Sequence, residues 1–330
     1  MSRIALFSGK DCLQLALLHE VMVEKGVKPL SCDMRLGGDG APLMSFNSKQ
    51  ARWDNHDFTD VAAMYIRCRT PNTLPALPPV LNPGFYSDYR SDYIREQGFS
   101  AATYSFFVDQ VRAGKLVINE LSTYSDHDTK AQFYEKLREQ KFPVPETLTT
   151  NDPLQALAFV DRHKEVVVKP SVGVGSTRLF TLQDRERLDQ IRLCPLMMQK
   201  RIPGDTLRVN IVGDSVVLAL RVLGSGETVD SRTAPKGFDF VKLPPAEEER
   251  IVRANRALGL HYAAWDIIEA KDGSYVYLDC NPGPYILWTG PVFSRIVMEQ
   301  LAEYMIAYSR TRSVSASSAA VRPYRPGNHA

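Results

Sequence analysis

The alternation of apolar and polar residues predicts short strands and amphipathic helices that follow one another along the chain. Residues 4–8 form an apolar run of strand length, and residues 13–23 have the periodicity of a helix that ends at Gly26. Residues 27–32 predict the next strand, and residues 61–69 (VAAMYIRCR) predict a buried strand that ends in two arginines. This order predicts an α/β layer built on a parallel sheet.

The turn at residues 7–12 (FSGKDC) leaves two functional interpretations beside a plain strand-to-helix turn. One is a phosphate-binding loop, because backbone N–H groups and the helix dipole attract anions at a helix N-terminus. The other is a degenerate form of the Ser-Gly-Gly-x-Asp-Ser loop of enzymes that cleave ATP to AMP. The second glycine of that loop is missing here, and G-x-x-x-x-G-K-[ST] occurs nowhere in the chain. A plain turn is the simplest explanation.

The rest of the N-terminal third is harder to interpret. Residues 71–83 are rich in proline and predict an extended connection, and residues 86–113 predict one or two helices. Ordinary core and surface packing explains this segment most simply. Four arginines are nevertheless candidates for a pocket that binds an acidic substrate: Arg67, Arg69, Arg90 and Arg95.

Residues 165–182 form the most informative pattern in the middle of the chain. A β-branched strand ends at Lys169, glycines follow at Gly173 and Gly175, and residues 178–182 predict a returning strand. Glycines let backbone N–H groups approach phosphate oxygens closely, and the lysine adds a positive charge beside them. The pattern predicts a hairpin flap, whereas a dinucleotide-binding turn would lead into a helix.

Two helices are predicted before this flap. The first covers residues 129–139, with residues 125–128 (SDHD) as N-cap candidates, and the second begins after Asp152 and ends near His163. Strands are predicted on either side of the second helix and flap, at residues 146–150 and 197–202.

Two further strands, residues 206–212 and 215–223, each carry an arginine among apolar residues. Arg208 and Arg221 need partners if these strands are half buried. A triphosphate is one candidate partner, and an Asp or Glu across the sheet is an equally common structural one. A polar loop at 224–240 and a charged helix at 246–258 follow.

Residues 264–288 (AWDIIEAKDGSYVYLDCNPGPYILW) predict two strands joined by a Lys-Asp-Gly turn. Pairing of the strands would bring Asp266, Asp279 and Asn281 to one end of a sheet. Carboxylate and amide oxygens suit Mg²⁺, which usually bridges protein carboxylates to substrate phosphates. An amphipathic hairpin with a polar rim is the alternative.

The composition narrows the class of protein. The 330 residues, of which 44% are hydrophobic and 24% charged, are enough for two or three domains. A net charge of +2 gives no indication of a nucleic-acid partner. The five cysteines are scattered without a C-x-x-C pair, which argues against a zinc site or a disulfide scaffold and favours a cytoplasmic protein. No apolar run has the length of a membrane span or signal peptide, so no membrane partner is expected.

The order of these parts resembles the ATP-grasp superfamily of carboxylate–amine/thiol-type ligases over residues 121–310. The motifs that carry the resemblance are Asp128-Thr129-Lys130, Val167-Val168-Lys169-Pro170 with its glycine flap, Gln199–Ile202, Leu207-Arg208-Val209, and Asp266…Asp279-x-Asn281-Pro282.

The resemblance implies a fold class, an α/β N-terminal domain followed by an ATP-grasp fold of two α+β subdomains. We expect the N-terminal domain at 1–120, the central subdomain with the flap at 121–200 and the C-terminal subdomain with the metal site at 201–312. Residues 313–330 lack apolar periodicity and are expected to be a disordered tail.

The resemblance also implies the ligands of each group. ATP would be held by Lys130, Lys169, the flap residues Gly173, Gly175 and Ser176, and the linker residues Gln199, Lys200 and Ile202, with Asp205 or Thr206 near the ribose. Asp266, Asp279 and Asn281 would hold Mg²⁺, as two ions, for which Mn²⁺ is an alternative. The catalytic candidates are Arg208, Arg221 and Lys169.

Three positions depart from the pattern of the superfamily. Lys200 occupies a place often held by Glu, and Thr206 stands where an acidic ribose ligand is common. Both put the adenosine contacts in doubt. Asp279 replaces the usual Glu, which shortens the side chain by one methylene and leaves the metal site intact.

Two groups within the superfamily are most similar: the ligases that add glutamate to protein tails and the graspetide or microviridin-type ligases that crosslink ribosomal peptides. The activity implied is an ADP-forming ligase that activates a small-molecule or peptide carboxylate as an acyl phosphate and joins it to an amine or hydroxyl. Phosphoryl transfer of this kind needs no protein nucleophile.

The alternative is a catalytically inactive nucleotide-binding scaffold or sensor. A homodimer is expected from similar proteins. A dinucleotide-binding dehydrogenase is excluded, because G-x-G-x-x-G does not follow the first strand.

Overall fold

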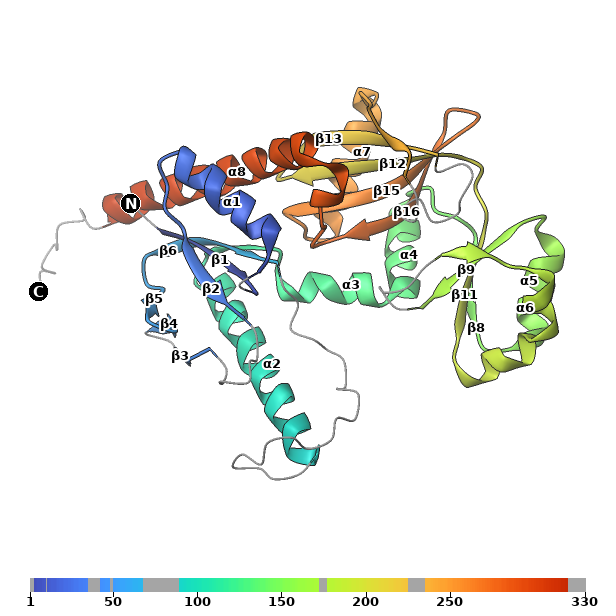
Figure 1. The fold of residues 1–330 in the computed structure, drawn as a ribbon, viewed down its shortest axis with the longest axis horizontal. Coiled ribbons are helices and arrows are strands. Elements are labelled where there is room, and N and C mark those ends of the chain that lie inside the picture. The colour runs from blue at the N-terminus through green and yellow to red at the C-terminus, as the bar shows by residue number, and fades with distance from the viewer. Residues whose placement is uncertain are drawn as a thin grey trace, which may run out of the picture. The chain divides into compact units, whose positions relative to one another are not determined.

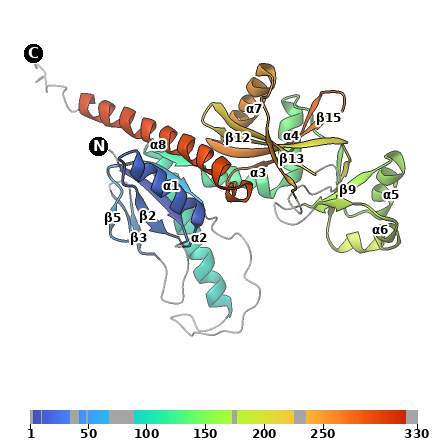
Figure 2. The same ribbon diagram turned by 45° about the horizontal axis from the view of Figure 1, so that its top comes forward.

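The computed structural model describes residues 3–9, 11–34, 42–47, 50–67, 89–171, 177–224 and 235–319, with side chains from Glu96 onward in the long helix α2 and as far as Arg312 in the last helix. The described chain divides into two compact units (Figures 1 and 2). Unit 1 combines Met1–Leu121 with Met298–Ala330, and unit 2 is Ser122–Val297. The last helix, Pro291–Ala319, therefore contributes to both units, whereas the sequence assigned residues as far as 312 to the C-terminal subdomain and the rest to a tail.

Unit 1 is built on a four-stranded sheet in the order β2-β1-β6-β7. Every pair of neighbouring strands is parallel, which confirms the predicted α/β layer. The elements are β1 (Arg3–Ser8), α1 (Leu13–Glu24), β2 (Leu30–Asp33), β6 (Val61–Ile66), α2 (Tyr89–Arg112) and β7 (Leu116–Ile118), with a small antiparallel sheet of β3 (Met44–Phe46), β4 (Ala51–Trp53) and β5 (His56–Asp57). The segment predicted as one or two helices contains the single helix α2.

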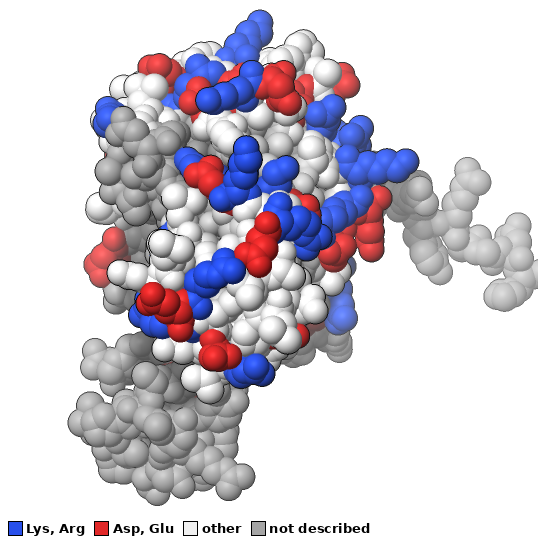
Figure 3. All heavy atoms as spheres, turned by 90° about the vertical axis from the view of Figure 1, so that its right-hand side faces the viewer, with Lys and Arg blue, Asp and Glu red and all other residues white. Residues whose placement is uncertain are grey.

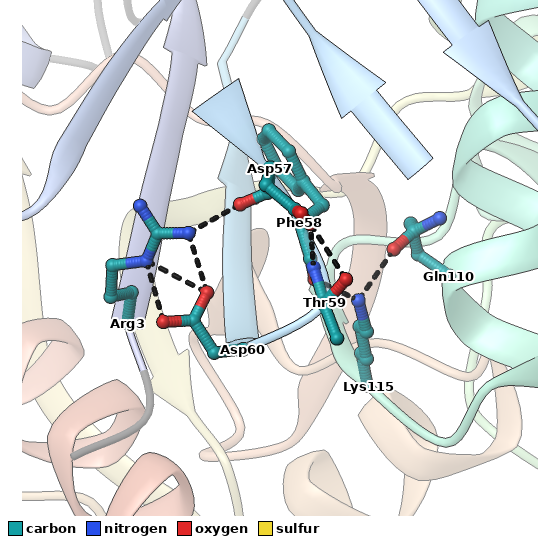
Figure 4. A network of polar contacts seen from close by, with 7 residues as sticks. All are labelled: Arg3, Asp57, Phe58, Thr59, Asp60, Gln110 and Lys115. Carbon is teal, nitrogen blue, oxygen red and sulfur yellow. Dashed lines mark hydrogen bonds and ion pairs between the residues drawn. The ribbon is translucent and has the colours of Figure 1, made fainter. Parts of the chain in front are cut away.

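Two sets of contacts hold unit 1 together. Buried aromatic rings of the strands and of α2 pack edge to face, for example Phe7 against Trp53 with ring centroids 5.1 Å apart. A polar network joins β1, the turn before β6, α2 and Lys115, the residue directly before β7 (Figure 4). In it, Arg3 Nε donates to Asp60 Oδ1 at 2.8 Å, and Lys115 Nζ donates to Gln110 Oε1 at 2.8 Å and to the Phe58 carbonyl. Burial, with the positive charge of Arg312 nearby, lowers the pKa of Lys115 to about 8.

The central part of unit 2 is an antiparallel sheet in the order β10-β9-β11-β8. Its elements are β8 (Thr147–Thr150), α5 (Pro153–Arg162), β9 (Val166–Pro170), β10 (Arg178–Leu179), α6 (Leu182–Glu186), the 3₁₀ helix η2 (Leu188–Leu193) and β11 (Leu196–Lys200). Asp152 caps α5 as predicted, since its Oδ1 accepts the Leu154 N–H at 2.9 Å. Apolar side chains of α5 and η2 cover one face of the sheet. On the side drawn in Figure 3, basic and acidic side chains are interspersed.

The second part of unit 2 is a five-stranded antiparallel sheet in the order β14-β13-β12-β15-β16. Its strands are β12 (Gly204–Val212), β13 (Ser215–Leu223), β14 (Gly237–Phe240), β15 (Tyr262–Ala270) and β16 (Tyr275–Asn281). The other elements of this part are η1 (Leu121–Thr123), α3 (Tyr124–Asp128), α4 (Lys130–Glu139), α7 (Pro245–Ala257) and η4 (Leu287–Thr289). The last helix, α8 (Pro291–Ala319), begins in this unit and belongs to unit 1 from Met298 onward.

The two faces of the five-stranded sheet differ in character. Alternate residues of β12, Leu207, Val209 and Ile211, join the hydrophobic core with residues of α4 and α7, and we call this the core face. Thr206, Arg208 and Asn210 belong to the opposite face, which we call the site face because it carries the candidate site described below.

Four predictions about single elements were wrong or incomplete. Residues 125–128 lie in the separate short helix α3, so they do not cap α4, and the N-cap position Thr129 makes no side-chain cap bond. The returning strand β10 ends at Leu179, and Leu182 begins α6. The polar loop predicted at 224–240 ends in strand β14. The segment expected to be disordered from 313 is helical as far as Ala319.

Within the described chain, each helix is too short or too polar to span a bilayer.

Candidate active site

The register of β12, β15 and β16 brings the three predicted metal ligands onto one face. Asp266 lies opposite Arg208 on one side and opposite Asp279 on the other, and Asn281 lies opposite Ala264. Side chains opposite each other in an antiparallel sheet point to the same face. The predicted hairpin is therefore confirmed, and its register places Asp266, Asp279 and Asn281 on one face of the sheet. Their role as metal ligands stays a prediction.

Arg208 and Asp266 form the first ion pair of the site face. Arg208 Nη1 lies 2.8 Å from Asp266 Oδ1, and the arginine side chain is only 8% exposed. Its Nε is buried and makes no hydrogen bond among the residues that the structure describes. Burial of an incompletely bonded guanidinium is costly, so this arginine has unused capacity to bind an anion.

Lys130 and Asp279 form the second ion pair of the site face. Lys130 comes from the first turn of α4, and its Nζ contacts Asp279 Oδ1 with the lysine side chain 5% exposed. Burial of Asp279 opposes its ionisation, but the charges of Lys130, His127 and Lys169 outweigh burial and lower the pKa of Asp279 to about 2. The carboxylate is therefore ionised at neutral pH.

Lys169, from β9, lies close to the same group of residues through Tyr134. Lys169 Nζ donates to Tyr134 Oη at 2.6 Å and lies 5.0 Å from the centre of the tyrosine ring. Tyr134 Oη in turn donates to the carbonyl of Leu278 on β16. The sequence interpretation missed Tyr134, although its spacing of four residues from Lys130 on a predicted helix was a usable signal.

Arg221 does not join this group, because it belongs to the core face. Arg221 lies opposite Leu207, which belongs to the core face, whereas the next residue of β12, Arg208, belongs to the site face. Arg221 Nε lies 3.2 Å from Asp205 Oδ2, and Nη2 contacts Glu269 Oε2. The structural alternative stated for this arginine, an acidic partner across the sheet, is the arrangement observed. Asp205, expected near a ribose, is one of these partners.

The predicted adenine linker joins the two sheets of unit 2. Gln199 is buried, and its Nε2 donates to Thr147 Oγ1 at 2.9 Å, whereas Lys200 is exposed and Ile202 half buried. The Lys200 N–H donates to the Glu146 carbonyl at 3.0 Å, which fixes the start of the linker. The contacts to adenine remain a prediction.

Several predicted site residues lie outside the described residues. Gly173, Gly175 and Ser176 of the flap belong to this group, as do Lys10 and Arg69 and the side chains of Arg90 and Arg95. The strands β9 and β10 that flank the flap pair antiparallel, as a hairpin requires. The acidic-substrate pocket of unit 1 stays a prediction.

The donors of the site face fit Mg²⁺ if a nucleotide supplies further ligands. No three His, Cys, Asp or Glu side chains within the described ranges cluster closely enough to hold a metal by themselves. Asp266, Asp279 and Asn281 offer two carboxylates and one amide, all hard oxygen donors, and Mg²⁺ commonly completes its shell with phosphate oxygens and water. Both carboxylates are occupied by basic side chains, so the ion must compete with Lys130 and Arg208.

A pocket of 620 Å³ lies near the β9–β10 hairpin, and Lys169 is one of its lining residues. Val168, Lys169 and Pro170 of this lining belong to a motif recognised in the sequence, whereas its residues from α6 and η2 were not singled out, since those helices were not predicted. The remaining lining residues are Arg178, Phe180, Asp184, Arg187, Leu188, Gln190, Ile191, Cys194, Pro195 and Leu196.

Comparison with known sequences gives matches to part of the chain. A family model described as an ATP-grasp domain matches residues 127–224. The tetrahydromethanopterin:alpha-L-glutamate ligase of Methanocaldococcus jannaschii is 27% identical over 184 residues, which cover 51% of this chain and 62% of that protein. The glutathione synthetase of Nitrosomonas europaea is 30% identical over 132 residues, 36% of this chain and 39% of that protein. The match thus spans less than two thirds of each of these two relatives.

Comparison with solved structures extends the likeness to nearly the whole chain. The ATP-grasp ligase PsnB, in complex with a minimal precursor, Mg and ADP, matches with a TM-score of 0.78 and 22% identity, covering 93% of this chain and 98% of that one. The macrocyclase MdnC of Microcystis aeruginosa, bound to the precursor peptide MdnA, matches with a TM-score of 0.73 and 18% identity, covering 92% and 99%. Together with the family model, these matches confirm the predicted fold class.

Proposed function

Because the chain has the ATP-grasp fold, we propose that it is an ATP-dependent ligase that activates a carboxylate as an acyl phosphate and joins it to an amine or hydroxyl, releasing ADP and phosphate. The observation that carries the proposal is the pairing on the site face. Asp266 contacts Arg208, and Asp279 contacts Lys130. Mg²⁺ can bind the two carboxylates while the phosphates of the nucleotide bind the two basic side chains.

The carboxylate is proposed to belong to a peptide. PsnB and MdnC are both described in complex with precursor peptides, and the likeness to them includes the N-terminal part of this chain as well as the ATP-grasp domain. A peptide carboxylate joined to a side-chain hydroxyl or amine of the same peptide would give an ester or amide crosslink.

The residues of the site face would divide the work of the phosphoryl transfer. Lys130 and Lys169 bind phosphate oxygens, and Arg208 stabilises charge on the transferring phosphoryl group or on the reacting carboxylate. Bound Mg²⁺ supplies neutralisation of phosphate charge, with Asp266, Asp279 and Asn281 as its protein ligands. Two ions, and a substitute role for Mn²⁺, remain part of the proposal. The attacking carboxylate needs position more than activation, since it is ionised at neutral pH.

Arg221 is proposed to be a structural residue. Its guanidinium is held by Asp205 and Glu269 at one end of the core face, away from the site face. This assignment leaves Arg208 and Lys169 as the catalytic candidates.

A nucleotide-binding scaffold without catalysis is the second candidate. The observation that favours it is that this chain has Lys200 and Thr206 at positions where similar proteins commonly have acidic residues. The complete set of oxygen ligands on the site face argues against it, because a scaffold has no need of two carboxylates for a metal.

Product analysis tests the proposal. The protein is incubated with Mg²⁺-ATP and a pool of peptides rich in Asp, Glu, Ser, Thr and Lys, while ADP, AMP, phosphate and peptide mass are followed. We expect ADP and phosphate in step with the loss of one water per crosslink, and a loss of at least about a hundredfold in rate for Lys169→Ala. Formation of AMP and pyrophosphate would contradict the acyl-phosphate route. Nucleotide binding without turnover over a widened peptide pool would favour the scaffold.

A further inference from the structure

Tyr134 lies at the junction of three elements that carry the candidate site. It belongs to α4, its side chain is fully buried, and its Oη contacts both Lys169 on β9 and the Leu278 carbonyl on β16. Leu278 directly precedes Asp279 in the sequence. One hydroxyl therefore connects a lysine proposed to bind phosphate with the strand that carries a proposed metal ligand.

The helix α4 presents Tyr134 together with Lys130. The two residues are four positions apart, so their side chains lie on the same face of the helix. Lys130 contacts the carboxylate of Asp279, and Tyr134 contacts the carbonyl one residue earlier. This double attachment fixes the helix face against the end of β16, and the phenol cannot move without breaking a buried hydrogen bond.

A fixed phenol restricts the lysine that contacts it. Lysine has a flexible four-carbon stem and pays a large entropic cost when it is immobilised. The hydrogen bond of 2.6 Å and the ring 5.0 Å away limit the directions open to Lys169 Nζ before any ligand binds. Burial, followed by the negative charge of Asp279, raises the pKa of Tyr134. The phenol therefore stays protonated and neutral, and it can donate to Leu278 while it accepts from Lys169.

We propose that Tyr134 is a positioning residue that holds Lys169 toward the nucleotide phosphates. The inference rests on the proposed function, in which Lys169 binds phosphate. Preorganisation of this kind raises affinity by reducing the entropy lost on binding. Tyr134 itself touches no reacting atom in this scheme, and its effect on the nucleotide passes entirely through Lys169.

A double-mutant cycle between Tyr134 and Lys169 tests this dependence. The dissociation constant of ADP in the presence of Mg²⁺ is measured by calorimetry for wild type, Tyr134→Phe, Lys169→Ala and the double variant. We expect Tyr134→Phe to weaken binding about tenfold in the wild-type background. In the Lys169→Ala background the same change should cost less than about twofold, because the residue through which Tyr134 acts is gone.

Tyr277→Phe is the matched control. Tyr277 is also a fully buried tyrosine of unit 2, and its Oη donates to Glu247 at 2.7 Å on the core face. This variant also loses a buried hydrogen bond of a tyrosine hydroxyl, so its thermal unfolding temperature should fall as well. Its affinity for Mg²⁺ and ADP should stay within about twofold of wild type in both backgrounds.

Three outcomes would contradict the role proposed for Tyr134 or for Lys169. If Tyr134→Phe and Tyr277→Phe change ADP affinity equally, Tyr134 has only a structural role. If the loss caused by Tyr134→Phe persists in the Lys169→Ala background, it does not act through Lys169. If Lys169→Ala leaves ADP affinity unchanged, the proposed function loses its phosphate ligand, a failure distinct from the first two. Should Tyr134→Phe fail to fold, Tyr134→Met replaces it in the cycle, because its smaller, flexible apolar side chain adapts to the available space and has no hydroxyl.

Discussion

Arg208 and Arg221 show how one residue of strand register places similar side chains on opposite faces of a sheet. Both arginines stand on neighbouring strands among apolar residues, and the sequence offered the same two partners for each. In the structure Arg208 lies opposite Leu220, whereas Arg221 lies opposite Leu207, so the two side chains leave opposite faces of the sheet. Arg208 pairs with Asp266 beside Lys130 and Asp279, while Arg221 pairs with Asp205 and Glu269.

The two faces use their ion pairs differently. On the site face Arg208 and Lys130 are almost fully buried, with side chains 8% and 5% exposed, whereas Arg221 on the core face is 35% exposed. Interactions between charges strengthen as water is excluded, and exposed pairs contribute little to stability. The buried pairs are therefore where a metal and a phosphate can exert the largest effect by exchanging partners.

Replacement of the two arginines by alanine should give the largest contrast. We expect Arg208→Ala to lower the rate of ligation by about a hundred- to a thousandfold, because it removes a charge near the transferring phosphoryl group. Arg221→Ala should lower it less than about threefold and reduce the free energy of unfolding by about 1 kcal/mol or less. Steady-state ADP release and chemical denaturation measure the two effects. Comparable rate losses in the two variants would contradict a catalytic role for Arg208 and a purely structural role for Arg221.

Removal of the carboxylates should give the next largest contrast. Asp266→Asn and Asp279→Asn should each weaken Mg²⁺ binding in the presence of ADP by at least about tenfold, since each loses a charged ligand. Glu269→Gln on the core face is the control and should leave Mg²⁺ affinity unchanged. Calorimetric titration of Mg²⁺ into the protein with ADP distinguishes the variants. Retention of full affinity in Asp279→Asn would remove it from the metal site.

Binding of metal and nucleotide should be mutually dependent. Because Lys130 and Arg208 occupy the carboxylates, Mg²⁺ alone must displace them, whereas a nucleotide offers these cations new partners. We expect ADP to raise Mg²⁺ affinity about 5- to 150-fold, with an equal effect of Mg²⁺ on ADP affinity.

Lys130→Met tests this dependence directly. It should strengthen binding of Mg²⁺ alone, because Asp279 loses its competitor, and weaken binding of ADP. Lys136→Met, also on α4 but paired with Asp126 at 2.6 Å, should change neither affinity. Equal Mg²⁺ affinity in Lys130→Met and wild type, without nucleotide, would contradict the competition.

The smallest effect should appear in the acid range. The pKa of Asp279 is lowered from 3.8 to about 2 in the folded protein. Its contribution to stability is therefore complete above about pH 4 and is lost as the pH falls through the folded value near 2. With EDTA present, the free energy of unfolding of wild type should fall by about 1–2 kcal/mol more between pH 4 and pH 2 than that of Asp279→Asn. Parallel pH profiles in denaturant titrations would show that Asp279 carries no depressed pKa.

Local patterns in the sequence were enough to predict most strands and helices of unit 2. The hairpin of β15 and β16, the turn between β12 and β13, and the cap at Asp152 depend on residues close together in the chain. Lys130, Asp266 and Asp279 were selected as candidate site residues because they belong to motifs at recognisable spacing. Those motifs also led to the correct fold class.

Features that depend on contacts between distant segments were not predictable. The face assigned to Arg221 depends on its register with β12, and a shift by one residue would reverse it. The contacts of Tyr134 could not be predicted, because its partners, Lys169 and Leu278, are 35 and 144 residues away; only its place one turn after Lys130 could be recognised from the sequence. The helices at 182–193 were missed because a charged segment of this length satisfies several patterns equally well.

Transfer of oxygen from substrate to phosphate tests the central claim most directly. A peptide substrate whose carboxylates carry ¹⁸O is incubated with the protein, Mg²⁺ and ATP, and the released phosphate is analysed by mass spectrometry. The account predicts a single ¹⁸O in the phosphate for each bond formed, because the carboxylate oxygen that attacks the γ-phosphorus leaves with it. Unlabelled phosphate, or ¹⁸O recovered in AMP, would contradict activation through an acyl phosphate on the site face.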